Sequence, residues 1–320
     1  LKTLAKEYPR ETNLQRTIAK DFKHFLHTNG KIVGATPVWN VIITGNSGSG
    51  KTRLAKLLAK ILGLWGIFSH TKTAPSQDAQ DGTYNGSDLL SGFVGQTSGQ
   101  VKKIFADNIE RTCIVDEAYD MISNEYGNDA VPRLLTLLQN RIGLTGFFML
   151  GYEDAMDELL HTNQGLRSRF SLKLHVENMS AQQLCAVFYR TYLNLLCQEP
   201  ATEDGSTLSV EELFEMDARR TFFFIINECV NPPPEAVDQN GVPKWFNFYY
   251  LIERQANVVV GLANDLSKMR SRADGSKVTA ENIIDLFEFY INNQEGEKLA
   301  LDFLAWFGWH ITTNNNRGPR

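Results

Sequence analysis

The sequence predicts an α/β fold with a parallel sheet, followed by a smaller domain made only of helices. Short apolar runs alternate with amphipathic helical stretches up to about residue 178, which is the pattern of a parallel sheet with crossover helices. A glycine-rich loop joins the first of these runs to a helix. Beyond residue 180 the strand patterns stop, and only helical ones follow. The 320 residues are enough for one core domain and a second, smaller one.

Five short apolar runs are the predicted strands. They cover residues 38–44, 65–69, 111–116, 146–151 and 171–176. A polar loop is expected at 70–86, before a helix that starts near Thr97. A further helix is expected at 132–141, with Pro132 in its first turn, where the missing N–H costs little. Strands that alternate with helices predict a sheet that is covered on both faces.

The predicted helical domain begins where Ser180 can cap a helix that runs to about Leu196. A helix from Val210, an apolar run at 222–226, a proline-rich insertion at 231–243, a helix at 248–269 and a helix capped by Thr279 follow in order. The predicted organisation is an N-terminal helical linker at 1–36, an α/β nucleotide-binding domain at 37–178, a helical domain at 179–293 and a C-terminal extension at 294–320.

The glycine-rich loop matches the phosphate-binding pattern G-x-x-x-x-G-K-S/T in full. Its residues are Gly45, Asn46, Ser47, Gly48, Ser49, Gly50, Lys51 and Thr52. A predicted strand precedes it, and a helix with one apolar face follows it. In this context the backbone N–H groups and the helix N-terminus bind a polyphosphate. Because Lys51 is expected to reach the β- and γ-phosphates and Thr52 to hold Mg²⁺, the sequence predicts binding of ATP or GTP.

Two adjacent carboxylates end the third predicted strand. Asp116 is expected to bind Mg²⁺, and Glu117 is expected to activate the attacking water as a general base. A surface acidic pair is common on its own, but beside a phosphate loop it favours hydrolysis. No guanine-reading N-K-x-D motif follows the loop, so ATP is favoured over GTP.

The composition argues against several other classes of protein. A hydrophobic content of 42% and a charged content of 22% are typical of soluble globular proteins. The net charge of -5 argues against a protein that coats nucleic acid. No apolar run approaches the ~18 residues of a membrane span. The four widely spaced cysteines form no C-x-x-C pair, which indicates free thiols in a reducing, cytoplasmic compartment.

Six blocks of the sequence share one further pattern. They are residues 45–52, 92–97, 114–119, 125–127, 150–157 and 163–170. In these blocks, their order and their spacing, the chain resembles the AAA+ ATPases, and within them the CbbX-like branch of red-type Rubisco activases, stage V sporulation protein K and type VII secretion relatives. The helical remainder resembles the AAA+ lid more loosely. The resemblance implies a hexameric ring that uses Mg²⁺ and ATP to remodel a protein substrate.

The resemblance also gives roles to residues outside the phosphate loop. Phe93, Val94 and Gly95 occupy the position of the pore loop, whose aromatic side chain grips an extended polypeptide. A core phenylalanine is the alternative, which the flanking glycines and polar residues disfavour. Arg169, and second to it Arg167, occupy the place of the arginine finger, which reaches the γ-phosphate of a neighbouring subunit. Interface salt bridges or solvated arginines are the alternative.

Two positions depart from the AAA+ pattern. Residues 150–152 stand where most members have a polar sensor 1 residue, and Val260 stands where a lid arginine, sensor 2, is expected. Arg254 lies nearly two turns earlier. The alternative function is therefore a nucleotide-binding scaffold with slow or no hydrolysis. A DNA-directed AAA+ machine is a third possibility, against which the acidic charge balance counts.

The apolar, aromatic stretch at 299–309 is expected to dock onto the lid or to contact a further domain of a tandem AAA+ protein. The expected partners are accordingly copies of the chain in a ring, or tandem AAA+ domains, and a protein substrate. Neither a nucleic acid nor a membrane is expected.

Overall fold

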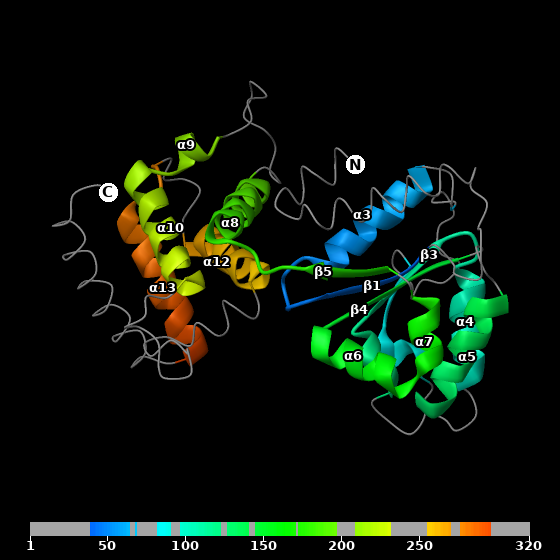
Figure 1. The fold of residues 1–320 in the computed structure, drawn as a ribbon. Coiled ribbons are helices and arrows are strands. Elements are labelled where there is room, and N and C mark those ends of the chain that lie inside the picture. Colours follow the sequence, from blue (N-terminus) through cyan, green and yellow to red (C-terminus); the bar gives the residue numbers. More distant parts are fainter. Residues whose placement is uncertain are drawn as a thin grey trace. The chain divides into compact units, whose positions relative to one another are not determined.

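The structure is a computed structural model of the chain. It describes residues 39–64, 68, 82–90, 97–122, 127–140, 145–170, 172–196, 209–231, 255–269 and 276–295. The chain divides into two units, Leu1–Glu177 and Asn178–Arg320 (Figure 1). The predicted linker at 1–36 lies outside the described residues, as does nearly all of the predicted extension at 294–320. The four predicted domain ranges stay predictions.

The first unit contains a five-stranded parallel sheet, which confirms the predicted fold class. Its strands are β1 (Asn40–Gly45), β2 (Thr83–Asn85), β3 (Thr112–Asp116), β4 (Gly146–Gly151) and β5 (Leu172–Val176), arranged in the order β2-β3-β4-β1-β5. In β1, Thr44 lies opposite Gly151 of β4 and His175 of β5. Because all strands run the same way, the residues that follow β1, β3 and β4 meet at one edge of the sheet.

Helices cover both faces of the sheet (Figure 1). One face is covered by α3 (Lys51–Leu64), which packs on Val41 and Ile43. The other face, where Ile42 points, carries η2 (Gly86–Leu89), α4 (Thr97–Asp107), η3 (Ala118–Ile122), α5 (Gly127–Asn140), α6 (Glu153–Thr162) and α7 (Gln164–Arg169). β1 is therefore apolar on both sides, as expected for a central strand of a covered parallel sheet.

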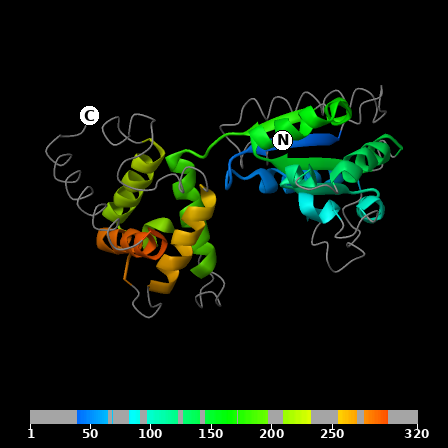
Figure 2. The ribbon, with the colours of Figure 1, turned by 90° about the horizontal axis from the view of Figure 1, so that it is seen from below.

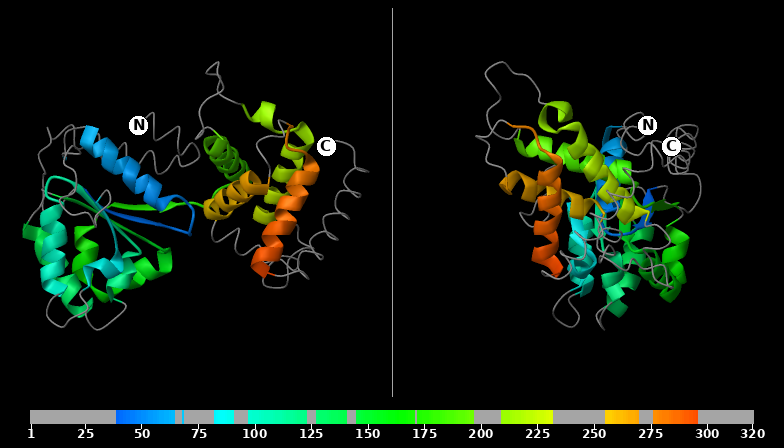
Figure 3. Two further views of the ribbon diagram at one scale, coloured as in Figure 1. Left: turned by 180° about the vertical axis from the view of Figure 1, so that it is seen from behind. Right: turned by 90° about the vertical axis from the view of Figure 1, so that its left-hand side faces the viewer.

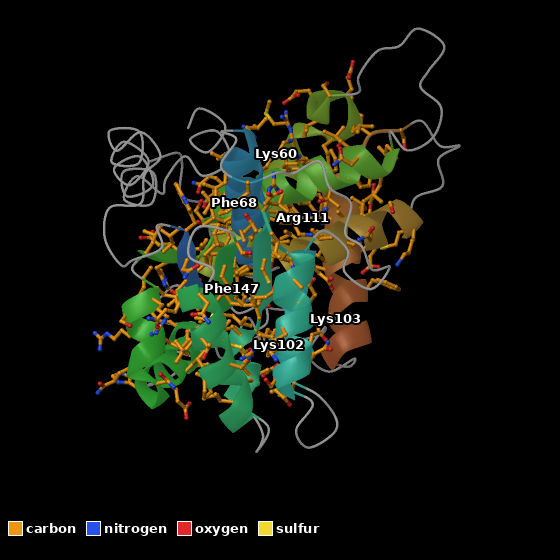
Figure 4. All side chains as sticks on the ribbon, turned by 90° about the vertical axis from the view of Figure 1, so that its right-hand side faces the viewer. Lys60, Phe68, Lys102, Lys103, Arg111 and Phe147 are labelled. Atoms are coloured by element: carbon orange, nitrogen blue, oxygen red, sulfur yellow. The ribbon has the colours of Figure 1, made fainter. Side chains whose placement is uncertain are left out.

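The second strand is not where the sequence predicted it. β2 lies inside the predicted loop at 70–86 and pairs with β3. Of the predicted strand at 65–69 only Phe68, labelled in Figure 4, is described. It lies outside the strands and is buried in one cluster with Ile114 and Phe148. The sequence Thr-Tyr-Asn of β2 has no apolar run, so hydrophobicity alone indicated the wrong segment.

Helix α5 begins earlier than predicted. It starts at Gly127, so Pro132 lies inside the helix, past its first turn. An internal proline removes one i→i−4 hydrogen bond, and this position is therefore less favourable than the one predicted. The first residues of the helix, Gly-Asn-Asp, carry no apolar side chain. The helical spacing of apolar residues therefore begins only after them, and the sequence predicted a later start.

The described elements of the second unit are all helices, apart from an isolated parallel β-bridge between Phe214 and Val278. Its elements are α8 (Ala181–Leu196), α9 (Val210–Leu213), α10 (Met216–Val230), α12 (Ala256–Met269) and α13 (Ala280–Glu295) (Figures 2 and 3). The core is aromatic: the rings of Phe188 and Phe222 stack at 4.0 Å between centroids. The predicted caps are confirmed, because the hydroxyl oxygens of Ser180 and Thr279 accept backbone N–H bonds three residues on, at 3.4 and 3.3 Å.

Helix α12 begins at Ala256, within the helix predicted at 248–269, of which residues 248–254 lie outside the described part. Gln255 has a φ of 37° and is not helical. Its buried side chain accepts a hydrogen bond from Met179 N at 2.7 Å and donates one to Asn178 Oδ1 at 2.6 Å. These bonds give the buried amide its partners and hold Gln255 in the left-handed conformation. Among the described helices, none has the length and apolar character needed to cross a membrane.

Candidate active site

The loop between β1 and α3 is shaped by its glycines. Gly45, Gly48 and Gly50 have φ angles of 148°, 70° and 102°, values that other residues rarely adopt. A Cβ atom on Gly45 would lie 2.5 Å from the carbonyl oxygen of Val176. The loop leads directly into α3, whose N-terminus carries the positive end of the helix dipole. This arrangement favours an anion at the loop.

One polar atom inside the loop is buried without a partner. The hydroxyl of Ser49, a residue with 1% exposure, has no hydrogen-bond partner among the described residues. The Ser49 Oγ atom would lie 3.0 Å from a Cβ atom built on Gly45, so it is on the inner side of the loop. A buried hydroxyl without a partner is unfavourable, and a bound phosphate oxygen would provide one. The loop thus fits a polyphosphate.

The ammonium group of Lys51 lies against the loop. Its Nζ donates to the carbonyl oxygens of Gly45 at 2.9 Å and Asn46 at 3.0 Å. It also lies 5.1 Å from the centroid of the Tyr152 ring. Burial lowers the pKa of Lys51 from its ordinary value, and the carboxylates of Asp116 and Glu117 partly oppose this effect.

Thr52 and Asp116 are brought together by α3 and β3. The Thr52 hydroxyl donates to Asp116 Oδ2 at 2.7 Å, and Asp116 Oδ1 accepts the backbone N–H of Glu117 at 3.1 Å. A hydroxyl and a carboxylate are oxygen ligands of the kind that Mg²⁺ accepts beside phosphates and water. The two residues therefore fit the predicted metal role.

Glu117 is held in an unusual backbone conformation. Its φ of 47° lies in the left-handed region, which costs a residue other than glycine roughly 1 kcal/mol or more. Its carbonyl oxygen accepts the backbone N–H of Asp120 at 2.9 Å, and its side chain is exposed. Strain that is retained beside a phosphate loop is a reason to look for function at this residue.

Gly86, at the start of η2, supports the backbone of Glu117. A Cβ on Gly86 would lie 2.3 Å from the carbonyl oxygen of Glu117, a backbone atom that cannot simply rotate away. We expect Gly86→Ala to displace Glu117 and lower ATP turnover roughly 10- to 100-fold, with ADP affinity retained. Turnover and calorimetric ADP binding measure the two effects. Gly99→Ala is the control, because a Cβ there meets nothing within 4 Å; equal turnover in both variants would contradict the prediction.

The two candidate arginines lie at the other end of the sheet. The Arg169 carbonyl accepts a hydrogen bond from the side chain of Asn40, the first residue of β1, whereas the phosphate loop follows the last. The five steps between the first and last of the six residues of β1 span about 17 Å at ~3.3 Å per step. The Arg169 guanidinium donates to Gly165 O and Gln139 Oε1, and Arg167 is exposed. Neither arginine therefore belongs to the phosphate loop of its own chain.

Two tyrosines at this edge had no predicted role. Tyr152 follows β4 directly, and its ring lies 6.0 Å from that of Tyr119 in η3. Burial first, and then the nearby Glu117 carboxylate, raise the pKa of Tyr119 to about 12. The sequence offered one signal, because the AAA+ resemblance places residues 150–152 at the sensor 1 position, at the end of the fourth strand. The predicted pore loop (Phe93, Val94 and Gly95) lies outside the described residues.

Residues 41–178 match the family described as "ATPase family associated with various cellular activities (AAA)". Over these residues, which carry the parallel sheet, the chain is similar to the AAA family. The matched range contains the lysine and threonine of the phosphate loop, the Asp116–Glu117 pair and both candidate arginines.

The chain is also similar to proteins of bacterial secretion systems. The ESX-1 secretion system protein EccA1 of Mycobacterium leprae (strain TN) is 27% identical over 183 residues, which are 55% of this chain and 29% of that protein. The ESX-3 secretion system protein EccA3 of Mycolicibacterium smegmatis is 27% identical over 155 residues, 47% of this chain and 24% of that protein. The match thus spans less than a third of the length of these relatives.

A solved structure of a RuvB mutant from Thermotoga maritima shares the fold. Its TM-score is 0.52 at 14% sequence identity, over 89% of this chain and 72% of that one. At this identity the likeness concerns the fold alone.

Proposed function

We propose that this chain is an AAA+ ATPase of the CbbX-like branch, which hydrolyses ATP with Mg²⁺ in order to remodel a protein substrate. The observation that carries the proposal is the 2.7 Å contact between Thr52 and Asp116 at the phosphate loop, with Glu117 next in the chain. Nucleotide binding alone requires no second carboxylate. A strained glutamate beside the metal position therefore supports hydrolysis.

Each residue of the site has a role in this proposal. The backbone of Gly45, Asn46, Ser47, Gly48, Ser49 and Gly50 surrounds the phosphates, and Lys51 binds the β- and γ-phosphate oxygens. Thr52 and Asp116 would hold Mg²⁺, which supplies charge neutralisation at those oxygens. Glu117 accepts a proton from the attacking water. These roles agree with the contacts made by Lys51, Thr52 and Asp116.

A second copy of the chain completes the site. The backbone of Arg169 lies beside Asn40, at the opposite end of β1 from the phosphate loop, which supports a contact of Arg169 or Arg167 with the nucleotide of a neighbouring subunit. An arginine supplied in this way stabilises the negative charge of the transition state. This supports a homo-oligomer, which we propose to be a hexameric ring. The alternative is a tandem protein in which a second AAA+ domain provides the neighbouring site.

The proposed substrate is a polypeptide gripped by Phe93 in the central pore. The named relatives are secretion-system proteins, which agrees with a protein client, and the net charge of -5 disfavours nucleic acid. The cysteines Cys113, Cys185 and Cys229 are buried and free, which agrees with a reducing compartment, proposed to be the cytoplasm.

Steady-state ATP turnover, measured with Mg²⁺ over a range of protein concentrations, tests the proposal. Because the arginine acts between subunits, we expect specific activity to rise with concentration and then to level off. Lys51→Ala, which lacks the phosphate-binding cation, is the inactive control. Activity independent of concentration would contradict an arginine supplied by a neighbour.

Val260 favours one alternative function. It lies on α12, and the AAA+ resemblance of the sequence places it where a lid arginine is expected; a shift of this alignment by the proline-rich insertion at 231–243 is the alternative. Without that arginine the lid senses the nucleotide less directly, so the chain could act as a nucleotide-binding scaffold. ATP binding without turnover at any protein concentration would favour the scaffold over the ATPase.

A further inference from the structure

The ammonium of Lys51 is held by three acceptors. An ammonium group has three N–H donors, and those of Lys51 serve the carbonyl oxygens of Gly45 and Asn46 and face the ring of Tyr152. The ring centroid lies 5.1 Å from Nζ, within the ~6 Å at which an aromatic face attracts a cation. None of the ion pairs found between described residues includes Lys51.

The local structure alone does not explain a tyrosine at residue 152. Tyr152 is the N-cap of α6, yet its side chain makes no cap hydrogen bond, and serine, threonine, aspartate or asparagine would suit that position better. Its side chain is also 41% exposed, so it contributes little to the core. Among the described residues, the ring contacts Lys51 on one side and the ring of Tyr119 on another.

The neighbouring residues fix the position of this ring. The Tyr119 ring lies 6.0 Å from the Tyr152 ring at 33° between planes. Tyr119 itself packs over Gly151, where a Cβ would lie 2.9 Å from Tyr119 Cδ1. The missing side chain of Gly151 therefore gives Tyr119 the room to support Tyr152. The aromatic pair extends from the segment after Glu117 to Lys51.

We propose that Tyr152 holds the Lys51 ammonium in a nucleotide-free resting position and thereby lowers the affinity of the phosphate loop for nucleotide. The inference rests on the proposed function, in which phosphate oxygens take the N–H donors that the resting position uses. When a resting state is stabilised and does not bind the ligand, the apparent affinity falls by the factor by which that state is favoured over the binding-competent one. For a partly exposed cation–π contact this factor is about 2- to 10-fold.

Calorimetric titration with ADP in the absence of Mg²⁺ tests this in four proteins: the natural sequence, Tyr152→Leu, Tyr152→Phe and Tyr152→Trp. We expect Tyr152→Leu to bind ADP about 2- to 10-fold more tightly, because the ring is lost. Tyr152→Phe keeps the aromatic face and should match the natural sequence. Tyr152→Trp, with the strongest cation–π partner, should bind more weakly. Unchanged or weaker binding by Tyr152→Leu would overturn the proposal.

A second measurement needs no nucleotide. Acylation of lysine side chains in the nucleotide-free protein, followed by mass spectrometry, gives the labelling of Lys51 relative to Lys60, an exposed lysine on the same helix. Tyr152→Leu should raise this ratio about 2- to 10-fold and Tyr152→Phe should not. An unchanged ratio overturns the resting contact. If the protein with the natural sequence does not bind ADP, the proposed function is contradicted together with this inference. If it binds ADP with an affinity that is the same in Tyr152→Leu, only this inference is contradicted.

Discussion

Replacing Glu117 with glutamine is expected to lower ATP turnover at least 100-fold while nucleotide binding persists. Glutamine has nearly the same shape but cannot accept the proton of the attacking water, and a general base contributes about 10²- to 10⁴-fold to a rate. The substituted side chain starts from the same exposed position, and the hydrogen bonds of Lys51 to Gly45 and of Thr52 to Asp116 are not altered. Single-turnover hydrolysis and the ADP affinity separate the two effects.

The control for Glu117 is another carboxylate of the same segment. Asp120 lies in η3, and Asp120→Asn removes an equal charge close by while leaving the backbone bond to Glu117 O in place. We expect its turnover to stay within about 2-fold of the natural sequence, since surface charges contribute little. A Glu117→Gln chain with full activity would show that the base is elsewhere or that a different residue positions the water.

Loss of the arginines is expected to lower turnover by about 10³-fold, since a finger arginine contributes roughly 10³- to 10⁵-fold. We expect the larger loss at Arg169. Its guanidinium is held by Gly165 and Gln139, which leaves other N–H donors in a fixed position for a neighbour. Arg167 is exposed and less restrained. Turnover of Arg169→Ala and Arg167→Ala, each at a saturating protein concentration, ranks the two.

Mixing variants distinguishes a neighbour's arginine from a local one. Arg169→Ala retains Glu117, and Glu117→Gln retains Arg169, so a mixed ring contains interfaces at which both residues are present. We expect a mixture of the two inactive chains to recover a measurable part of the activity. A mixture that stays as inactive as its components would contradict the proposal of a shared site.

The sequence predicts those parts of the site that depend on local patterns. The phosphate loop is one continuous motif whose glycines determine its backbone, so Lys51 and Thr52 could be placed without a structure. The contact of Thr52 with Asp116 was also within reach, because both follow strands of one parallel sheet. The whole α/β arrangement rests on the same alternation of strand and helix.

Features that depend on distant partners could not be predicted in this way. β2 is a three-residue edge strand, and its pairing with β3 decides its conformation, since strand preference depends on neighbours. Gln255 leaves the helical conformation because Asn178 and Met179 bind its side chain from across the helical unit. The Lys51–Tyr152 contact depends on the rotamers of two side chains, which no sequence pattern specifies.

Gly86 connects Glu117, the proposed general base, to the chain that precedes the predicted pore loop. The carbonyl oxygen of Glu117 lies so close to Gly86 that there is no room for a methyl group. Gly86 is the first residue of η2, which ends at Leu89, two residues before residues 91–96 begin. Close-packed interiors transmit displacement rather than absorb it. If a substrate held at Phe93 displaces η2, Gly86 would therefore displace the backbone of Glu117 with it. Mechanical load and the rate of ATP hydrolysis would then be coupled within a single chain.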